Sequence, residues 1–184
     1  VNHVVFSSGI KPTPHWKRIY DGKQSGVAIS GKANATLEKN YIHSNTHPGV
    51  HVQDEFSKAE LTNNSIHHGK QGLVFICRKA SATLKDNNIH SNTNAGVEVH
   101  GEGSKAELRN NSIHHGKECG VFISDKASAT LESNDIHSNT LDGVKVEGEG
   151  TVAMLSNNRI HNGKEWGVYI YDKASATLEN NDIY

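Results

Sequence analysis

The stretch LESNDIH, residues 131–137, is one of seven variants of a single pattern in this chain. In each variant an asparagine follows a leucine by three residues, and an isoleucine follows the asparagine by two. The isoleucines are Ile42, Ile66, Ile89, Ile113, Ile136, Ile160 and Ile183. Counted from Ile19, the intervals between them alternate between 23 and 24 residues. A fixed period in the twenties predicts a solenoid in which each repeat forms one coil.

Composition agrees with a solenoid and excludes some partners. Only 34% of the 184 residues are hydrophobic, which suits coils with thin cores of small aliphatic side chains. The net charge of -1 gives no electrostatic reason to expect binding to nucleic acid or to an anionic membrane. No apolar run approaches the length of a membrane span. The chain begins at Val1 without a signal-peptide pattern, so we expect an excerpt or a processed chain.

Within each coil, apolar residues alternate with polar ones at a period of two. Residues 120–123 place Val121 and Ile123 on one face and Phe122 on the other. The segments 129–131 and 136–137 alternate in the same way, which predicts three short, half-buried strands per coil. About seven such coils, stacked in register, make an all-β parallel β-helix over residues 19–184. Residues 1–18 fit the pattern poorly and are predicted to form a degenerate coil or cap.

The prediction of a cap depends on three residues before Ile19. Pro12, Pro14 and Lys17 stand where later coils have alanine, leucine and asparagine. Proline cannot donate a hydrogen bond to a sheet and is confined to edges and ends.

The coils are of two alternating kinds. One kind continues after its isoleucine as His-Ser-Asn-Thr, and the other as His-His-Gly-Lys or a close variant. The complete repeat is therefore a pair of coils, 47 residues long.

Asparagine and glycine mark the bends between strands. Asparagine tolerates bend conformations, and its amide can bond the same amide in the coils above and below. We predict such a ladder at Asn40, Asn64, Asn87, Asn111, Asn134, Asn158 and Asn181. Glycine marks a second bend in six coils, and Leu73 interrupts that series, which predicts a local irregularity.

The pattern Gly-Val-x-Ile followed by Leu-x-x-Asn-x-Ile-His resembles the right-handed parallel β-helix repeat of the pectin-lyase-like fold. That repeat occurs in carbohydrate-binding proteins and sugar hydrolases. The alternation of residues 158–171 with residues 134–144 is similar to the β-helix of F-box substrate receptors of ubiquitin ligases. The resemblance covers about residues 19–184. It implies a right-handed coil and, in the second family, a protein partner, although this chain contains no F-box.

The acidic residues do not predict catalysis. On this fold, lyases need clustered acids for calcium with an Arg or Lys base, and hydrolases need converging carboxylates. Asp125 and Asp172 are expected two coils apart, about 10 Å, and so are Asp135 and Asp182. We interpret these residues as solvated surface charge and expect neither enzymatic activity nor a cofactor.

A column of histidines follows the isoleucines. His43, His67, His90, His114, His137 and His161 are predicted to stack outside the third strand, with His68 and His115 as a second row. Histidine binds metals, but a catalytic metal needs ligands that face one another rather than form a line. We therefore interpret the column as packing, not as a metal site. Repulsion between rings about 5 Å apart is expected to lower their pKa values.

The outer face of the first strand is the predicted binding surface. Its outward residues are expected to form one column in which aromatic residues recur at every second coil, with charged residues between them. Exposed aromatic residues flanked by charge suit a protein interface, and a spacing of about 10 Å also suits a β-linked glycan. We expect a protein partner, with a carbohydrate-binding or degenerate carbohydrate-active β-helix as the alternative. The candidate binding residues are Phe75, Glu98, Phe122, Lys145, Trp166, Tyr169 and Tyr171.

Two further expectations concern location and assembly. Cys77 and Cys119 occupy different positions in different coils and are expected to be free thiols. Free thiols favour the cytoplasm or nucleus, with secretion as the alternative. Because Tyr184 ends in mid-coil, its unpaired strand edges predict end-to-end self-association.

Overall fold

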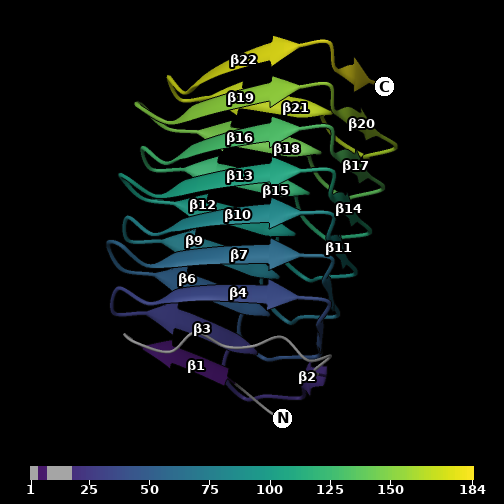
Figure 1. Cartoon of the computed structure of the whole chain (residues 1–184). Coiled ribbons are helices and arrows are strands. Elements are labelled where there is room, and N and C mark those ends of the chain that lie inside the picture. Colours follow the sequence, from purple (N-terminus) through teal and green to yellow (C-terminus); the bar gives the residue numbers. More distant parts are fainter. Residues whose placement is uncertain (1–3, 8–17) are drawn as a thin grey trace.

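The computed structural model describes residues 4–7 and 18–184, which form a parallel β-helix (Figure 1). The coils are stacked from the N-terminal end to the C-terminal end, and three parallel sheets run along the stack. The predicted fold class is confirmed. No helix of the described residues is long and apolar enough to cross a membrane. The proline-bearing cap predicted around Pro12, Pro14 and Lys17 lies outside the described residues.

Each full coil gives one strand to each sheet. Sheet A contains β1 (Val4–Ser7), β3 (Val27–Ser30), β6 (Val50–Gln53), β9 (Val74–Cys77), β12 (Val97–His100), β15 (Val121–Ser124), β18 (Val144–Glu147) and β21 (Val168–Tyr171). Sheet B contains β2 (Arg18–Tyr20), β5 (Tyr41–His43), β8 (Ser65–His67), β11 (Asn88–His90), β14 (Ser112–His114), β17 (Asp135–His137), β20 (Arg159–His161) and β23 (Asp182–Ile183). Sheet C contains β4 (Asn34–Glu38), β7 (Lys58–Thr62), β10 (Ser81–Lys85), β13 (Lys105–Arg109), β16 (Ser128–Glu132), β19 (Val152–Ser156) and β22 (Ser175–Glu179).

The strands pair so that equivalent residues of successive coils lie side by side. Leu84 aligns with Leu108 in sheet C, and Ile89 aligns with Ile113 in sheet B. These four side chains are at most 1% exposed. Because side chains alternate across a strand, one face of every strand fills the core while the other faces outward. A slip of one residue would turn the apolar set outward, so the alternation fixes the register.

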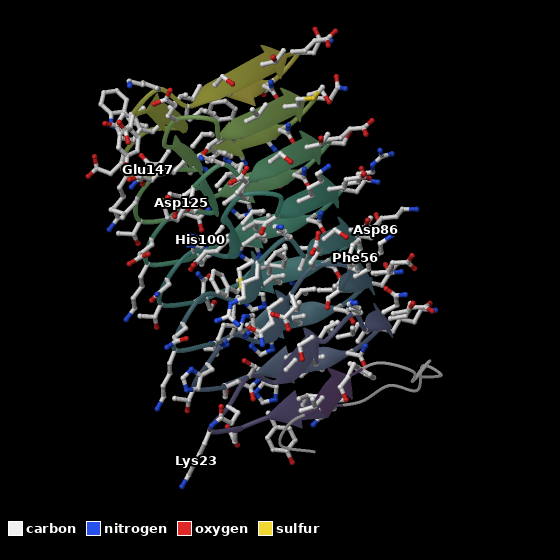
Figure 2. All side chains as sticks on the ribbon, turned by 90° about the vertical axis from the view of Figure 1, so that its left-hand side faces the viewer. Lys23, Phe56, Asp86, His100, Asp125 and Glu147 are labelled. Carbon is white, nitrogen blue, oxygen red and sulfur yellow. The ribbon has the colours of Figure 1, made fainter. Side chains whose placement is uncertain are left out.

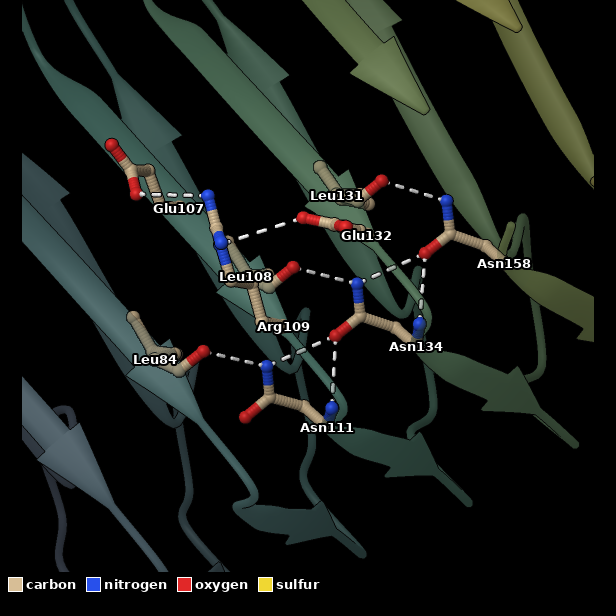
Figure 3. Close-up of polar contacts among 9 residues, drawn as sticks. All are labelled: Leu84, Glu107, Leu108, Arg109, Asn111, Leu131, Glu132, Asn134 and Asn158. Atoms are coloured by element: carbon tan, nitrogen blue, oxygen red, sulfur yellow. Dashed lines mark hydrogen bonds and ion pairs between the residues drawn. The ribbon is translucent and has the colours of Figure 1, made fainter. Parts of the chain in front are cut away.

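The predicted asparagine ladder runs through the bend between sheets C and B (Figure 3). Nδ2 of Asn111 donates to Oδ1 of Asn134 at 3.0 Å and to the Leu84 carbonyl at 2.9 Å. Oδ1 of Asn111 accepts from the backbone N–H and from Nδ2 of Asn87, both at 3.0 Å. Each inner amide thus makes four hydrogen bonds while buried, so the bend has no orphan side-chain polar group.

The glycine bend lies between sheets B and A, where consecutive coils come very close. A Cβ atom on Gly120 would lie 2.6 Å from Cγ2 of Ile136 and 2.7 Å from the Gly143 carbonyl oxygen. Leu73 takes the equivalent place in its coil and is 1% exposed. The strand register on both sides of it is unchanged, so the predicted irregularity does not extend to the backbone pairing.

The extra residue of the 24-residue coils lies in the turn between sheets A and C. Short turns carry a lysine at this edge, and long turns carry a glutamate. Lysine and glutamate therefore alternate along the stack and form exposed ion pairs 3.2–3.9 Å long: Lys79–Glu55, Lys126–Glu102 and Lys173–Glu149. Each exposed ion pair adds little to the stability of the fold. The pairs can form, however, only where short and long turns alternate along the stack.

Candidate functional site

The predicted binding residues of sheet A do form one outward column. Strand pairing aligns Phe75 with Glu98, Glu98 with Phe122, Phe122 with Lys145, and Lys145 with Tyr169. Successive members belong to successive coils, so the three rings recur about 10 Å apart. From β9 to β18 the side chains of this column are partly exposed and their neighbours on either side are buried. In β21, at the end of the stack, Tyr169 and its neighbour Ile170 are both exposed. We call this set the sheet A column.

The last coils add an aromatic platform, which comprises Phe122, Lys145, Trp166, Tyr169 and Tyr171. Tyr169 and Tyr171 stack with ring centroids 4.7 Å apart, and Trp166 lies 6.3 Å from Tyr169 with its plane within 24°. Nζ of Lys145 lies 5.0 Å from the Phe122 ring centre and 5.1 Å from that of Tyr171. Lys145 therefore makes cation–π contacts with two rings of the platform, and its Nζ also lies 3.5 Å from Oε2 of Glu147.

Buried polar contacts hold the platform in place. Asp142 is 6% exposed, and its Oδ1 accepts a hydrogen bond of 3.2 Å from the backbone N–H of Trp166. The Trp166 side chain itself is 62% exposed. A side chain of this size on a fixed backbone can contact a ligand at little cost in conformational entropy.

Glu98 is the one carboxyl group of the sheet A column, and its pKa is strongly raised. Burial, reinforced by the nearby Glu118 carboxylate, raises the pKa of Glu98 to about 7, although a backbone hydrogen bond at Ala95 opposes the shift. Gly72 makes room for this carboxyl, since a Cβ atom on Gly72 would lie 2.5 Å from Oε1 of Glu98. A small pocket of about 130 Å³ opens here beside Phe75.

We expect Glu98 to titrate near neutral pH. With a pKa of about 7, its carboxyl is half protonated at neutral pH, whereas an ordinary glutamate, with a pKa of 4.5, is ionised there. An NMR titration of the side-chain carbonyl carbon would measure the midpoint. Glu118→Gln removes the second negative charge and should move the midpoint downward. A wild-type midpoint near 4.5 would show that the carboxyl is hydrated rather than buried.

The histidine column of sheet B stacks as predicted and ends on a tyrosine at each end. Neighbouring ring centroids are 4.8–5.2 Å apart and the planes lie within 16° of each other. The stack runs through Tyr20, His43, His67, His90, His114, His137, His161 and Tyr184. Among the described residues, no group of three or more His, Cys, Asp or Glu side chains could hold a metal ion.

The acidity of this column follows the predicted direction, but its main cause differs. Burial is the largest contribution that lowers the pKa values of His43, His67, His90, His114 and His137. For His67 and His114 the pKa falls to about 4, and neighbouring histidines are the second cause. Repeat spacing gives the distance between the rings, and hence their repulsion, but not how deeply each ring is buried.

A family model described as "Right handed beta helix region" matches residues 6–113 and 99–184. The chain belongs to the right-handed β-helix family. No curated protein matches it significantly.

Solved structures share the fold of this β-helix at low sequence identity. The periplasmic alginate epimerase AlgG is 13% identical with a TM-score of 0.76, over 91% of this chain and 44% of that one. The A-module of the Azotobacter vinelandii mannuronan C-5 epimerase AlgE6 is 14% identical with a TM-score of 0.64, over 91% and 59%. This chain thus spans about half the length of these enzymes, and at such identity the likeness shows the fold alone.

The structure also places the cysteines and the aspartates that were considered in the sequence. Cys77 and Cys119 are buried free cysteines, and burial raises the pKa of Cys119 to about 12, which leaves it a poor nucleophile. Asp135 and Asp182 lie in strands on either side of β20, and Asp135 pairs with His161 at 3.0 Å. Glu118 was not a candidate, because its proximity to Glu98 depends on how a side chain in a bend is directed towards a strand of another coil.

Figure 2 shows a further charged column beside the turn between sheets A and C. His100, Asp125 and Glu147 come from three consecutive coils. Nδ1 of His100 lies 3.0 Å from Oδ2 of Asp125. This pair is exposed, and it borders the sheet A column without entering it.

Proposed function

We propose that this β-helix binds an extended polysaccharide along the outer face of sheet A. The observation that carries the proposal is the two-coil repeat of Phe75, Phe122 and Tyr169, with charged residues between them. A ligand that meets all three rings must itself repeat at about 10 Å. A polymer of sugar rings has such a repeat, whereas the surface of a folded protein partner ordinarily does not.

The chemistry of the aromatic platform supports the same ligand class. The faces of Trp166 and Tyr169 are flat and apolar, as is the C–H face of a sugar ring, so the two can stack. Lys145, whose Nζ lies near the Phe122 and Tyr171 rings and 3.5 Å from Oε2 of Glu147, can donate hydrogen bonds to sugar hydroxyl or carboxylate oxygens. We propose binding of the polysaccharide without catalysis, because the features that repeat along this face are aromatic rings and charged side chains, which can contact a ligand.

The structural neighbours add support for the ligand class only. Their names describe epimerases of alginate and mannuronan, which are polysaccharides. These names support only the idea that a β-helix can present one of its faces to a polysaccharide chain. The residues that would do so here are those of the sheet A column and the aromatic platform.

Removing two platform rings tests the proposal. We expect the double variant Trp166→Ala/Tyr169→Ala to weaken binding to oligosaccharides by about tenfold or more, since each aromatic contact contributes about 0.5–1.5 kcal/mol beyond its burial. Isothermal titration calorimetry against neutral and uronic-acid oligosaccharides would measure the loss. Circular dichroism should show an unchanged fold, because Trp166 is 62% exposed.

Phe56→Ala provides a matched control. Phe56 is also 62% exposed, but it belongs to a turn between sheets A and C, where it lies near Lys32. Its removal should leave oligosaccharide binding unchanged. Equal loss in both variants, or no binding of any oligosaccharide by the wild type, would contradict a polysaccharide site on sheet A.

A protein partner is the second candidate, favoured by the crowding of three aromatic residues in one coil. Trp and Tyr are enriched where a few residues carry most of the energy of a protein interface, and Trp166, Tyr169 and Tyr171 form such a cluster. The resemblance to F-box substrate receptors would make that partner a ubiquitin-ligase substrate. A partner held by this cluster alone would be insensitive to Phe75→Ala, whereas a polymer that spans sheet A would not.

A further inference from the structure

A basic groove lies on a different edge of the coil, where the chain leaves sheet B. It has a volume of about 380 Å³ and crosses three coils. Of the described residues, those that line it include no carboxylate: His68, Gly69, Lys70, Ser91, Asn92, Thr93, His115 and Lys117. Two copies of the sequence His-Gly-Lys, at 68–70 and 115–117, therefore face each other across a neutral coil.

The lysines of this groove are not neutralised. Lys70 and Lys117 are exposed, and neither forms an ion pair with any residue in the described part of the chain. By contrast, the lysines at the turn between sheets A and C pair with glutamates of the coil before: Lys79, Lys126 and Lys173. The backbones of Lys70 and Lys117 lie two coils apart, at a distance of about 10 Å. Both side chains are long enough for their ammonium groups to converge on one small anion.

The outer histidines are oriented by hydrogen bonds to the inner column. Nδ1 of His115 lies 2.6 Å from Nδ1 of His114, and Nε2 of His114 lies 2.9 Å from Oδ1 of Asn88. An amide oxygen only accepts, so Nε2 of His114 carries a hydrogen and its Nδ1, when the ring is neutral, is bare. Nδ1 of His115 must then donate, which leaves Nε2 of His115 bare and free to take a proton. His67 and His68 repeat the contact at 2.6 Å.

The inner ring of each pair, His67 or His114, is held in its neutral form. Burial and the adjacent histidines lower the pKa of His67 and His114 to about 4, so the inner rings stay neutral in mild acid. His90 and His137 meet the outer rings edge-on, at 6.0 and 5.8 Å, and burial lowers their pKa values too.

Several charged groups surround the pairs: Asp21 and Arg18 act on His43, Asp135 and Arg159 act on His137, and the two lysines lie in the groove. Asp135 acts on the inner ring His114 and favours its charged form, which partly offsets burial. Lys70 and Lys117 line the groove itself. An anion that enters between these lysines is therefore the charge that favours protonated outer imidazoles.

We propose that this groove is an oxyanion site, in which Lys70 and Lys117 hold a carboxylate, sulfate or phosphate group and the outer rings of His68 and His115 donate to it once protonated. Charge-assisted hydrogen bonds of this kind are the strong ones in proteins. Binding is accordingly tighter in mild acid. The site is separate from the aromatic platform, so it stands or fails independently of the polysaccharide proposal.

The chain supplies its own control copies of this motif. The sequence Asp-Gly-Lys at 21–23 and Asn-Gly-Lys at 162–164 keep the lysine but replace the outer histidine. Figure 2 shows Lys23 extending away from the lowest coils. Asn162 has a φ of 55°, and His68 and His115 have φ values of 54° and 55°. Asparagine tolerates this left-handed region, so His→Asn changes should not strain the backbone.

The histidine variant tests the dependence on pH. Sodium sulfate, whose charge is constant, is titrated by calorimetry and NMR at about pH 5.5 and about pH 8. We expect wild-type binding to be about tenfold tighter at the lower pH, because a hydrogen bond donated by a charged imidazole is stronger than one from a neutral group. H68N/H115N should abolish this difference. A wild type with equal affinity at both pH values overturns the role of the imidazoles.

The lysine variants test the place of binding. K70Q/K117Q should weaken sulfate binding about tenfold or more at both pH values, while K23Q/K164Q should leave it unchanged. Equal losses in the two variants would show diffuse surface charge and overturn the site, as would no sulfate, phosphate or glucuronate binding by the wild type. Parallel titrations identify the source: glucuronate bound in preference to sulfate and phosphate supports an acidic group carried on a larger ligand.

Discussion

Asn111→Ala is expected to lower the free energy of unfolding by about 4 kcal/mol. The Asn111 side chain makes four hydrogen bonds in the middle of the ladder, and alanine replaces none of them. The change would leave the Leu84 carbonyl, the backbone N–H and amide of Asn87, and Oδ1 of Asn134 short of a partner. Each buried orphan costs about 1–3 kcal/mol, partly relieved where water enters the gap. Urea denaturation followed by circular dichroism would measure the loss.

Asn181→Ala is the matched comparison at the last rung. Its Nδ2 donates to the Leu155 carbonyl and its Oδ1 accepts from Asn158, but the side chain is only partly buried, so water can replace the lost bonds. We expect a loss of about 1 kcal/mol. If the two variants lose the same stability, burial of the ladder is not what makes it strong.

Mild acid is expected to destabilise the β-helix through its histidine column. Five of these histidines have pKa values lowered below 6.5, and those of His67 and His114 fall to about 4. The unfolded state therefore binds protons more readily. Stability is complete above pH 6.5 and is lost as the pH falls from there towards 4.

The size of the effect comes from the two largest shifts. Taken at face value, two pKa values of about 4 correspond to about 7 kcal/mol. Solvent screens the partly exposed rings, and we expect a loss of about 3 kcal/mol between about pH 7.5 and about pH 4.5. Chemical denaturation at a series of pH values would trace it.

A variant that lacks part of the column separates it from other acid effects. In His90→Thr/His114→Thr/His137→Thr, we expect a clearly smaller loss over the same interval. Carboxylates in ion pairs elsewhere on the β-helix, such as Glu55 with Lys79, are present in both proteins, so their effect cancels in the comparison. An equal loss in the variant and the wild type would assign acid sensitivity to those carboxylates instead.

Much of the fold could be predicted because a repeat turns local rules into global ones. Once Val121 and Ile123 are assigned inward and Phe122 outward, every coil follows the same assignment, and strand pairing bears it out. The ladder was predictable for the same reason, since one asparagine at one bend implies a partner above and below. Periodicity therefore sufficed for the strands, the register and the column of candidate residues on sheet A.

The acid–base properties could not be predicted from spacing. The pKa of Glu98 depends on its depth beside Gly72 and on Glu118, which belongs to a bend in another coil. The contacts between inner and outer histidines depend on left-handed backbone at His68 and His115. These features come from how non-equivalent positions meet, and a repeat pattern describes only equivalent ones.

The alternation of short and long turns makes the pair of coils the unit by which this molecule could be lengthened. A single added coil would set lysine against lysine at the turn between sheets A and C, whereas a duplicated block of 47 residues would continue the order unchanged. Each such block would add one ring to sheet A and extend the stack by about 10 Å. A designer could therefore set the length of sheet A in steps of one coil pair by choosing how many 47-residue blocks to join.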